Sequence, residues 1–83
     1  MSTELENLIR KLLTRREVFF DKTNVLNSDG RRLLNKIIRM VLREYPELRK
    51  LVSKTRKNPT LENVIKLAEE ITHMRELKSH TQR

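Results

Sequence analysis

The sequence predicts an all-α fold, a compact bundle of about four helices in a single domain. Three observations predict it. Apolar residues recur every three to four positions, the 83 residues include only one glycine and two prolines, and the helix-favouring residues Leu, Lys, Arg and Glu are abundant. The expected helices are 3–22, 29–45, 46–57 and 60–77. The domain spans residues 1–83, and residues 78–83, which have no apolar anchor, are expected to form a frayed tail.

The first helix is expected to begin at Ser2 or Thr3, because Thr3 and Glu6 have the spacing of a capping box. It is expected to continue to about Lys22, with Arg16 inside its apolar arc. The residues predicted for its apolar face are Leu5, Leu8, Ile9, Leu12, Leu13, Phe19 and Phe20. Turn-favouring residues then predict a loop over 23–30, in which Val25 and Leu26 fold back onto the core.

The second helix is expected to be capped by Ser28 or Asp29 and to end at Tyr45, because Pro46 disfavours helical geometry in the residue before it. Pro46 is also suited to the first turn of a third helix. The apolar face of the second helix is predicted to contain Leu33, Leu34, Ile37, Ile38, Val41, Leu42 and Tyr45.

The third helix is predicted to turn Leu48, Leu51 and Val52 inward, and Asn58-Pro59-Thr60 supplies a cap and a first-turn proline for the fourth. The fourth helix is predicted to have an inner face of Leu61, Val64, Ile65, Ala68, Ile71 and Thr72, with Leu67, Met74 and Leu77 at its side.

Composition excludes several kinds of chemistry. The absence of cysteine rules out disulfides, thiolate metal sites and cysteine nucleophiles, and Gly30 alone cannot form a glycine-rich phosphate loop. His73 and His80 lie near carboxylates but lack a metal-ligand pattern, so we expect no metal, no cofactor and no enzymatic activity. No apolar run is long enough to cross a membrane, and the early acidic residues argue against a signal peptide, so a cytoplasmic, nucleoid-associated location is expected.

Positive charge is concentrated in the middle of the chain. The formal net charge is +8, and residues 31–57 hold ten Lys or Arg against only Glu44 and Glu47, while the remaining residues sum to zero. Helical spacing places four of these cations on one narrow stripe: Arg32, Lys36, Arg39 and Arg43. Three lysines of the next helix are predicted to extend the same surface: Lys50, Lys54 and Lys57.

This stripe favours a polyanion as ligand. Like charges four residues apart oppose helix formation, and no acid lies between Arg31 and Arg43 to offset them. Nucleic acid is the natural polyanion, because phosphates repeat along a line. Asn35 is the only base-reading amide on this helix, so we expect backbone contacts, to DNA in the first instance, without sequence specificity. The alternatives are a solvated basic face, an acidic protein surface, and a basic amphipathic helix lying on anionic lipid.

A helix-turn-helix is a further alternative for nucleic-acid binding. Residues 31–45 would cross the DNA backbone, and residues 46–57 would be the recognition helix. Only Pro46 separates the two predicted helices, whereas the motif usually has a turn of three to four residues.

Some large side chains lie outside the predicted apolar faces or crowd them. Phe19 and Phe20 are adjacent, Met40 and Met74 lie off their main faces, and Arg16 falls in an apolar arc. These five residues are the candidates for a protein-docking patch, because aromatic and Met side chains are enriched at interfaces. The alternative is that the core of the bundle is wide enough to absorb the apolar ones.

The chain resembles the small, basic, all-helical accessory subunits of archaeal replicative DNA polymerases. The resemblance is in the length of 83 residues, the basic run from Arg31 to Lys57, the absence of a catalytic constellation, and a composition with 36% charged residues and one glycine that suits heat-adapted proteins. It implies a subunit that binds a polymerase catalytic subunit through one surface and holds DNA through another. The alternatives are a stand-alone nucleoid protein, expected as a homodimer, and a protein–protein adaptor with a solvated basic face.

Overall fold

The computed structural model describes the backbone of residues 3–81 and the side chains of residues 4–77. The α-helices are α1 (Thr3–Thr14), α2 (Arg16–Phe19), α3 (Ser28–Glu44), α4 (Arg49–Lys57) and α5 (Leu61–Thr81), with a short 3-10 helix at Pro46–Leu48. Within the described residues, extended pairing is limited to isolated bridges between Phe20 and Leu26 and between Val25 and Thr60. The prediction of an all-α bundle is confirmed.

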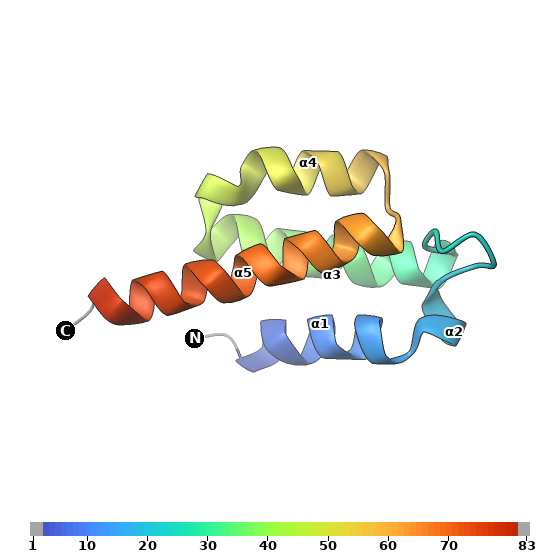
Figure 1. The fold of residues 1–83 in the computed structure, drawn as a ribbon, viewed down its shortest axis with the longest axis horizontal. Helices are drawn as coiled ribbons and strands as arrows, with labels where there is room; N and C mark the ends of the chain where they lie inside the picture. Colours follow the sequence, from blue (N-terminus) through green and yellow to red (C-terminus); the bar gives the residue numbers. More distant parts are fainter. Residues whose placement is uncertain (1–2, 82–83) are drawn as a thin grey trace.

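α3 is the central helix and contacts α1, α2 and α4, and α4 also contacts α5. In the view of Figure 1, α5 passes in front of α3, while α1 and α4 lie on opposite sides of it. Facing residues of α1, α3 and α5 meet so closely that only a void of about 10 Å³ remains between them. The core draws on every helix and on the loop before α3, and its buried apolar residues are Leu5, Leu12, Phe19, Phe20, Leu26, Leu33, Leu34, Ile37, Ile38, Val41, Tyr45, Leu48, Val52, Val64, Leu67 and Ile71.

The predicted helix 3–22 is wrong in its second half. α1 ends at Thr14, Arg15 leaves helical geometry with φ −114° and ψ 56°, and Phe20 is extended with φ −118° and ψ 146°. The physical reason is the pair Phe19 and Phe20, because adjacent residues of one helix point about 100° apart. The break and the extended residue let both rings enter the core, where they are 8% and 6% exposed.

The loop between α2 and α3 is tied down by hydrogen bonds. The carboxylate of Asp21 accepts from the Thr23 hydroxyl at 2.7 Å and from the Val25 and Thr23 amides at 3.1 and 2.8 Å. These bonds, the Thr23 hydroxyl first, lower the pKa of Asp21 below its usual 3.8. Leu26 is buried, as predicted, and its amide donates to the Pro59 carbonyl at 2.9 Å. The loop therefore fastens the start of α3 to the start of α5.

The cap of α3 differs from the prediction by one or two residues. The Asn27 side chain accepts a hydrogen bond from the Gly30 amide at 2.8 Å, so Asn27 is the N-cap and Ser28 and Asp29 lie inside the helix. Asn27 also donates from its side-chain amide to the Val18 carbonyl at 2.8 Å. One side chain thus caps α3 and holds α2 against it.

The end of α3 and the start of α5 lie next to the two prolines, Pro46 and Pro59. α3 ends at Glu44, one residue before the predicted Tyr45, and the predicted helix 46–57 begins as a 3-10 turn. The Thr60 hydroxyl accepts from the Asn63 amide at 3.2 Å at the start of α5. α5 continues to Thr81, so its predicted end at residue 77 is wrong. The side chains of Thr3 and of residues 78–83 lie outside the described residues, as do the predicted capping box and the end of the predicted tail.

Candidate nucleic-acid interface

The four cations of the α3 stripe lie together on the surface. Arg32, Lys36, Arg39 and Arg43 are all exposed, and the opposite face of α3 is buried in the core. The first and last cations of the stripe are eleven residues apart, or about 16 Å at a rise of 1.5 Å per residue. α5 packs against the buried face of α3. Because the stripe lies on the opposite face of α3, it points away from α5. The sequence prediction of this stripe is therefore correct in its geometry.

The cations of this stripe have little acidic compensation. Arg32 lies 3.6 Å from Asp29, but both side chains are largely exposed, and exposed pairs contribute about 0–1 kcal/mol. Over the described residues, Lys36, Arg39 and Arg43 make no salt bridge, and the other ion pair joins Arg75 to Glu6 elsewhere, between α5 and α1. The stripe is consequently available to an external anion at little cost.

The three predicted lysines of α4 form a separate row. Lys50, Lys54 and Lys57 are exposed on the face of α4 opposite the buried Val52 and Thr55. Lys50 also lines a hollow of about 530 Å³ between α4 and α5, together with Glu47, Leu51, Lys66, Glu69, Glu70 and Leu48. This row therefore lies on the outer side of α4, with Lys50 near acidic residues of α5, and it does not simply continue the α3 stripe as the sequence predicted.

Two exposed arginines of α4 are missing from the sequence prediction. Arg49 and Arg56 are two helical turns apart, and helical periodicity places both on the flank opposite Leu51. Leu51 borders the hollow shared with α5, so Arg49 and Arg56 lie on the flank away from α5. The α3 stripe points the same way. Their seven-residue spacing was visible in the sequence, but the position of α5, which decides the side they face, was not.

The predicted docking patch does not form. Phe19 and Phe20 belong to the core, and Met40 and Met74 are partly buried against it, so the alternative of a wide core is correct for these residues. Arg16 is exposed on α2, whereas the rings of Phe19 and Phe20, which were predicted to share the patch with it, are buried. Among the described residues, the large apolar side chains that are exposed are instead Val18, Leu42 and Leu77. Leu42, predicted to be inward, is 36% exposed beside the basic stripe.

All three aromatic side chains of the protein are buried. Tyr45 is 6% exposed, and burial, followed by the charges of Glu44 and Glu47, raises the pKa of its phenol above the usual 10.0. With Phe19 and Phe20 also in the core, the surface offers no aromatic ring on which a base could stack.

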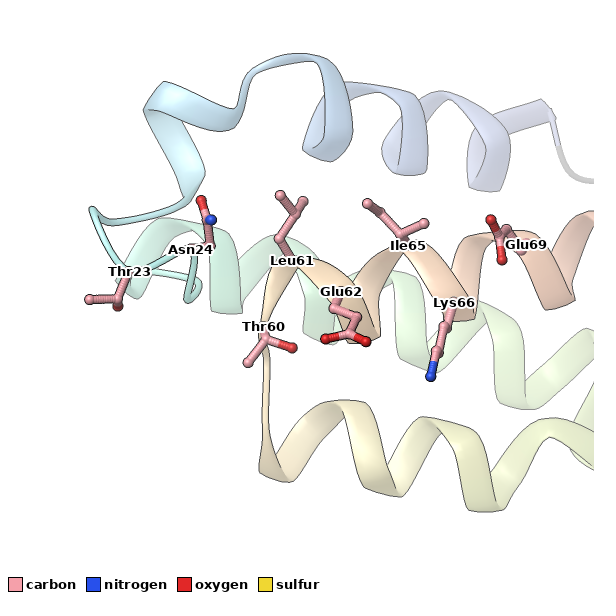
Figure 2. Close-up of a pocket in the computed structure, with 8 residues that line it drawn as sticks. All are labelled: Thr23, Asn24, Thr60, Leu61, Glu62, Ile65, Lys66 and Glu69. Atoms are coloured by element: carbon pink, nitrogen blue, oxygen red, sulfur yellow. The ribbon is translucent and has the colours of Figure 1, made fainter.

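A further hollow lies elsewhere and has a mixed lining. It measures about 620 Å³ and is bounded by Thr23 and Asn24 of the loop and by the first half of α5. In Figure 2, Leu61 and Ile65 point toward α1, whereas Glu62 and Lys66 point the other way. In the part of the chain that the structure describes, no three His, Asp or Glu side chains come together in a way that could hold a metal ion.

The structure bears on two of the alternatives left open by the sequence, the helix-turn-helix and the lipid-bound helix. Four residues, 45–48, separate α3 from α4, more than Pro46 alone, and the two helices run antiparallel as a hairpin (Figure 1). A helix-turn-helix has its helices crossing at about 90–120°. For lipid, the apolar face of α3 is already used in the core. None of the described helices is long and apolar enough to span a bilayer.

Comparisons with known proteins identify no relative: no protein-family model, no curated protein and no solved structure gives a significant match to this chain. The features that bear on function are therefore the charge, exposure and packing of its own residues.

Proposed function

We propose that this protein is a non-enzymatic DNA-binding accessory subunit, which contacts the phosphate backbone through the α3 stripe. The observation that carries the proposal is the row of four exposed cations, Arg32, Lys36, Arg39 and Arg43, directly opposite a fully packed apolar face. The backbone beneath the row is fixed, because the core holds the helix that carries it. When the four cations meet an array of phosphates, only their side-chain freedom is lost, and no backbone has to be ordered.

A solvated basic face explains the stripe less well. Solvated helix faces normally mix acidic and basic residues, which stabilise the helix through pairs three or four residues apart. Here the i,i+4 pairs Arg32–Lys36 and Arg39–Arg43 repel each other, and each such pair costs a few tenths of a kcal/mol. An external polyanion removes this cost by neutralising both members of each pair.

Recognition is expected to be independent of base sequence. Cations on α3 can reach phosphates, but base reading in the major groove needs Arg, Asn or Gln side chains that enter the groove in a defined register. Asn35 is exposed near the stripe, and it is the only amide residue within α3. Contacts to phosphate therefore provide the affinity.

The number of cations supports a helper role. A row of four provides about four phosphate contacts, and phosphate contacts alone give only a weak affinity at physiological salt, with a Kd of about 10⁻⁴ to 10⁻⁶ M. A larger protein that keeps DNA nearby would raise the effective concentration and compensate for this weak affinity. We therefore propose a partner that itself binds DNA, such as a polymerase catalytic subunit.

Charge reversal on the stripe tests the proposal. The double variant Arg39→Glu, Arg43→Glu is expected to lower DNA affinity by at least about tenfold, because two phosphate contacts are replaced by repulsion. Fluorescence anisotropy with a labelled duplex measures the affinity. Circular dichroism should show unchanged helicity, since both side chains are exposed.

The matched control is Lys22→Glu, Lys66→Glu, which changes the net charge by the same amount at exposed positions outside α3 and α4. It is expected to weaken binding by less than about threefold, through general electrostatics alone. Equal losses in the two double variants would show that net charge, not the α3 stripe, attracts the DNA.

A further inference from the structure

We infer that the DNA is double-stranded and that it is contacted by two rows of cations, the α3 stripe and a second row made by Arg49 and Arg56 of α4. This inference rests on the proposed function and deepens it by naming the form of the ligand and two further binding residues. The face that carries both rows, directed away from α5, is called the two-row face below.

The second row is placed by the packing of α4. Arg49 and Arg56 are exposed, whereas Leu48, which precedes them, and Val52 and Thr55, which lie between them, are buried. Leu51 faces the hollow bordered by α5, and Arg49 and Arg56 are on the opposite flank of the helix. α4 lies beside α3 (Figure 1). Because both rows turn away from α5, we place them on the same side of the molecule.

The dimensions of the two-row face suit a double helix. The α3 stripe extends for about 16 Å and the α4 row for about 10 Å along their helices. Packed helices have axes about 8–10 Å apart, so the two rows are separated by roughly that distance. Duplex DNA presents two phosphate strands on either side of a minor groove about 6 Å wide, with one charge per about 1.7 Å of axis. Each row can therefore follow one strand.

The loop between the helices makes the two rows converge at one end. The chain turns from α3 into α4 through residues 45–48, so Arg43 at the end of α3 and Arg49 at the start of α4 lie at the same end of the hairpin. From this end of the hairpin, the α3 stripe and the α4 row run side by side, on helices whose chain directions are opposite. A single strand has one line of phosphates and could satisfy only one of them.

The burial of the aromatic residues argues against a single strand independently. Proteins that bind single strands obtain about 1–3 kcal/mol per base by stacking bases on exposed aromatic rings. Phe19, Phe20 and Tyr45 are all in the core, so the unpaired bases of a single strand would find no such partner here. A duplex keeps its bases stacked internally and needs only its phosphates contacted.

The test compares a DNA duplex of about 20 base pairs, two helical turns, with one of its separated strands. The wild-type protein is expected to bind the duplex about tenfold more tightly than the strand, with a steeper dependence on salt. The variant Arg49→Glu, Arg56→Glu is expected to reduce the duplex salt slope by about 2 and to remove most of the preference, because it eliminates the second row.

The outcomes separate this inference from the proposed function. Equal wild-type affinity for duplex and single strand would overturn the inference, and the α3 stripe would still be the DNA-binding surface if Arg39→Glu, Arg43→Glu abolished both. An unchanged duplex slope in Arg49→Glu, Arg56→Glu would also overturn it. Failure of the wild-type protein to bind either form would refute the proposed function itself. The variant Lys22→Glu, Lys66→Glu again serves as the charge-matched control and is expected to keep the duplex preference.

Discussion

Truncation of Phe19 to alanine is expected to lower the free energy of unfolding by about 3–5 kcal/mol, because it removes a buried ring and leaves a cavity in the core. Phe19 is 8% exposed and belongs to the central cluster. At about 0.05–0.15 kcal/mol per residue, a domain of this size has a total stability of about 4–12 kcal/mol, so the variant is expected to lose a large part of it. Thermal or denaturant unfolding followed by circular dichroism measures the effect.

Val18→Ala provides the matched control for this prediction. Val18 precedes Phe19 in α2 but is 44% exposed, so its truncation should change stability by no more than about 0.5 kcal/mol. A stable, fully helical Phe19→Ala protein would contradict the packing and would return Phe19 to the predicted docking surface.

Replacement of Gly30 by alanine is expected to destabilise the protein by up to about 3 kcal/mol, although alanine is the better helix former. A Cβ atom at position 30 would lie 2.5 Å from the Phe19 carbonyl oxygen and 2.6 Å from a Leu26 methyl carbon. The carbonyl cannot simply retreat, because it accepts a hydrogen bond from the Asn27 amide at 2.9 Å. Alanine would thus force α2 away from the first turn of α3.

The neighbouring variant Ser28→Ala separates this clash from helix propensity. Ser28 is exposed in the same turn of α3, so its replacement by alanine should leave the melting temperature nearly unchanged. Gly30→Ala should lower it by roughly 4–8 °C per kcal/mol lost. A melting temperature equal to or above that of the wild type would contradict the close approach of α2 and α3 at this glycine.

The helices that sequence periodicity predicted best are those with one continuous apolar face. The second predicted helix corresponds to α3, and six of its seven predicted apolar residues are buried, because Pro46 marks its end and the apolar spacing is regular. Leu42 is the exception. It lies at the edge of the apolar arc, and no packing partner covers that edge completely, which periodicity alone does not reveal.

The break between α1 and α2 shows what periodicity could not supply. The apolar pattern from Leu5 to Phe20 fits one helix nearly as well as two, because both phenylalanines fall near the same arc. The break becomes favourable only when Leu26 pairs with Phe20 and Asn27 bonds back to the Val18 carbonyl. These are contacts between residues that belong to different predicted elements.

The basic surface was predictable only along each helix. The four cations of α3 follow from the spacing within one element, and the structure places them as the spacing indicated. The direction of α4 relative to α3 and α5 depends on tertiary packing, so the sequence selected the lysines on its outer side and omitted Arg49 and Arg56. The position of Leu51 beside α5 is what distinguishes the two flanks.

The salt dependence of duplex affinity tests the proposed role of the basic surface most directly. If the α3 stripe neutralises about four phosphates, and Arg49 and Arg56 add two more, the logarithm of the association constant should fall with the logarithm of salt concentration at a slope of about −5 to −6. Anisotropy titrations with one labelled duplex over a series of salt concentrations provide this slope. A slope near that value is the predicted result, and an affinity that does not change with salt would contradict phosphate binding by this surface.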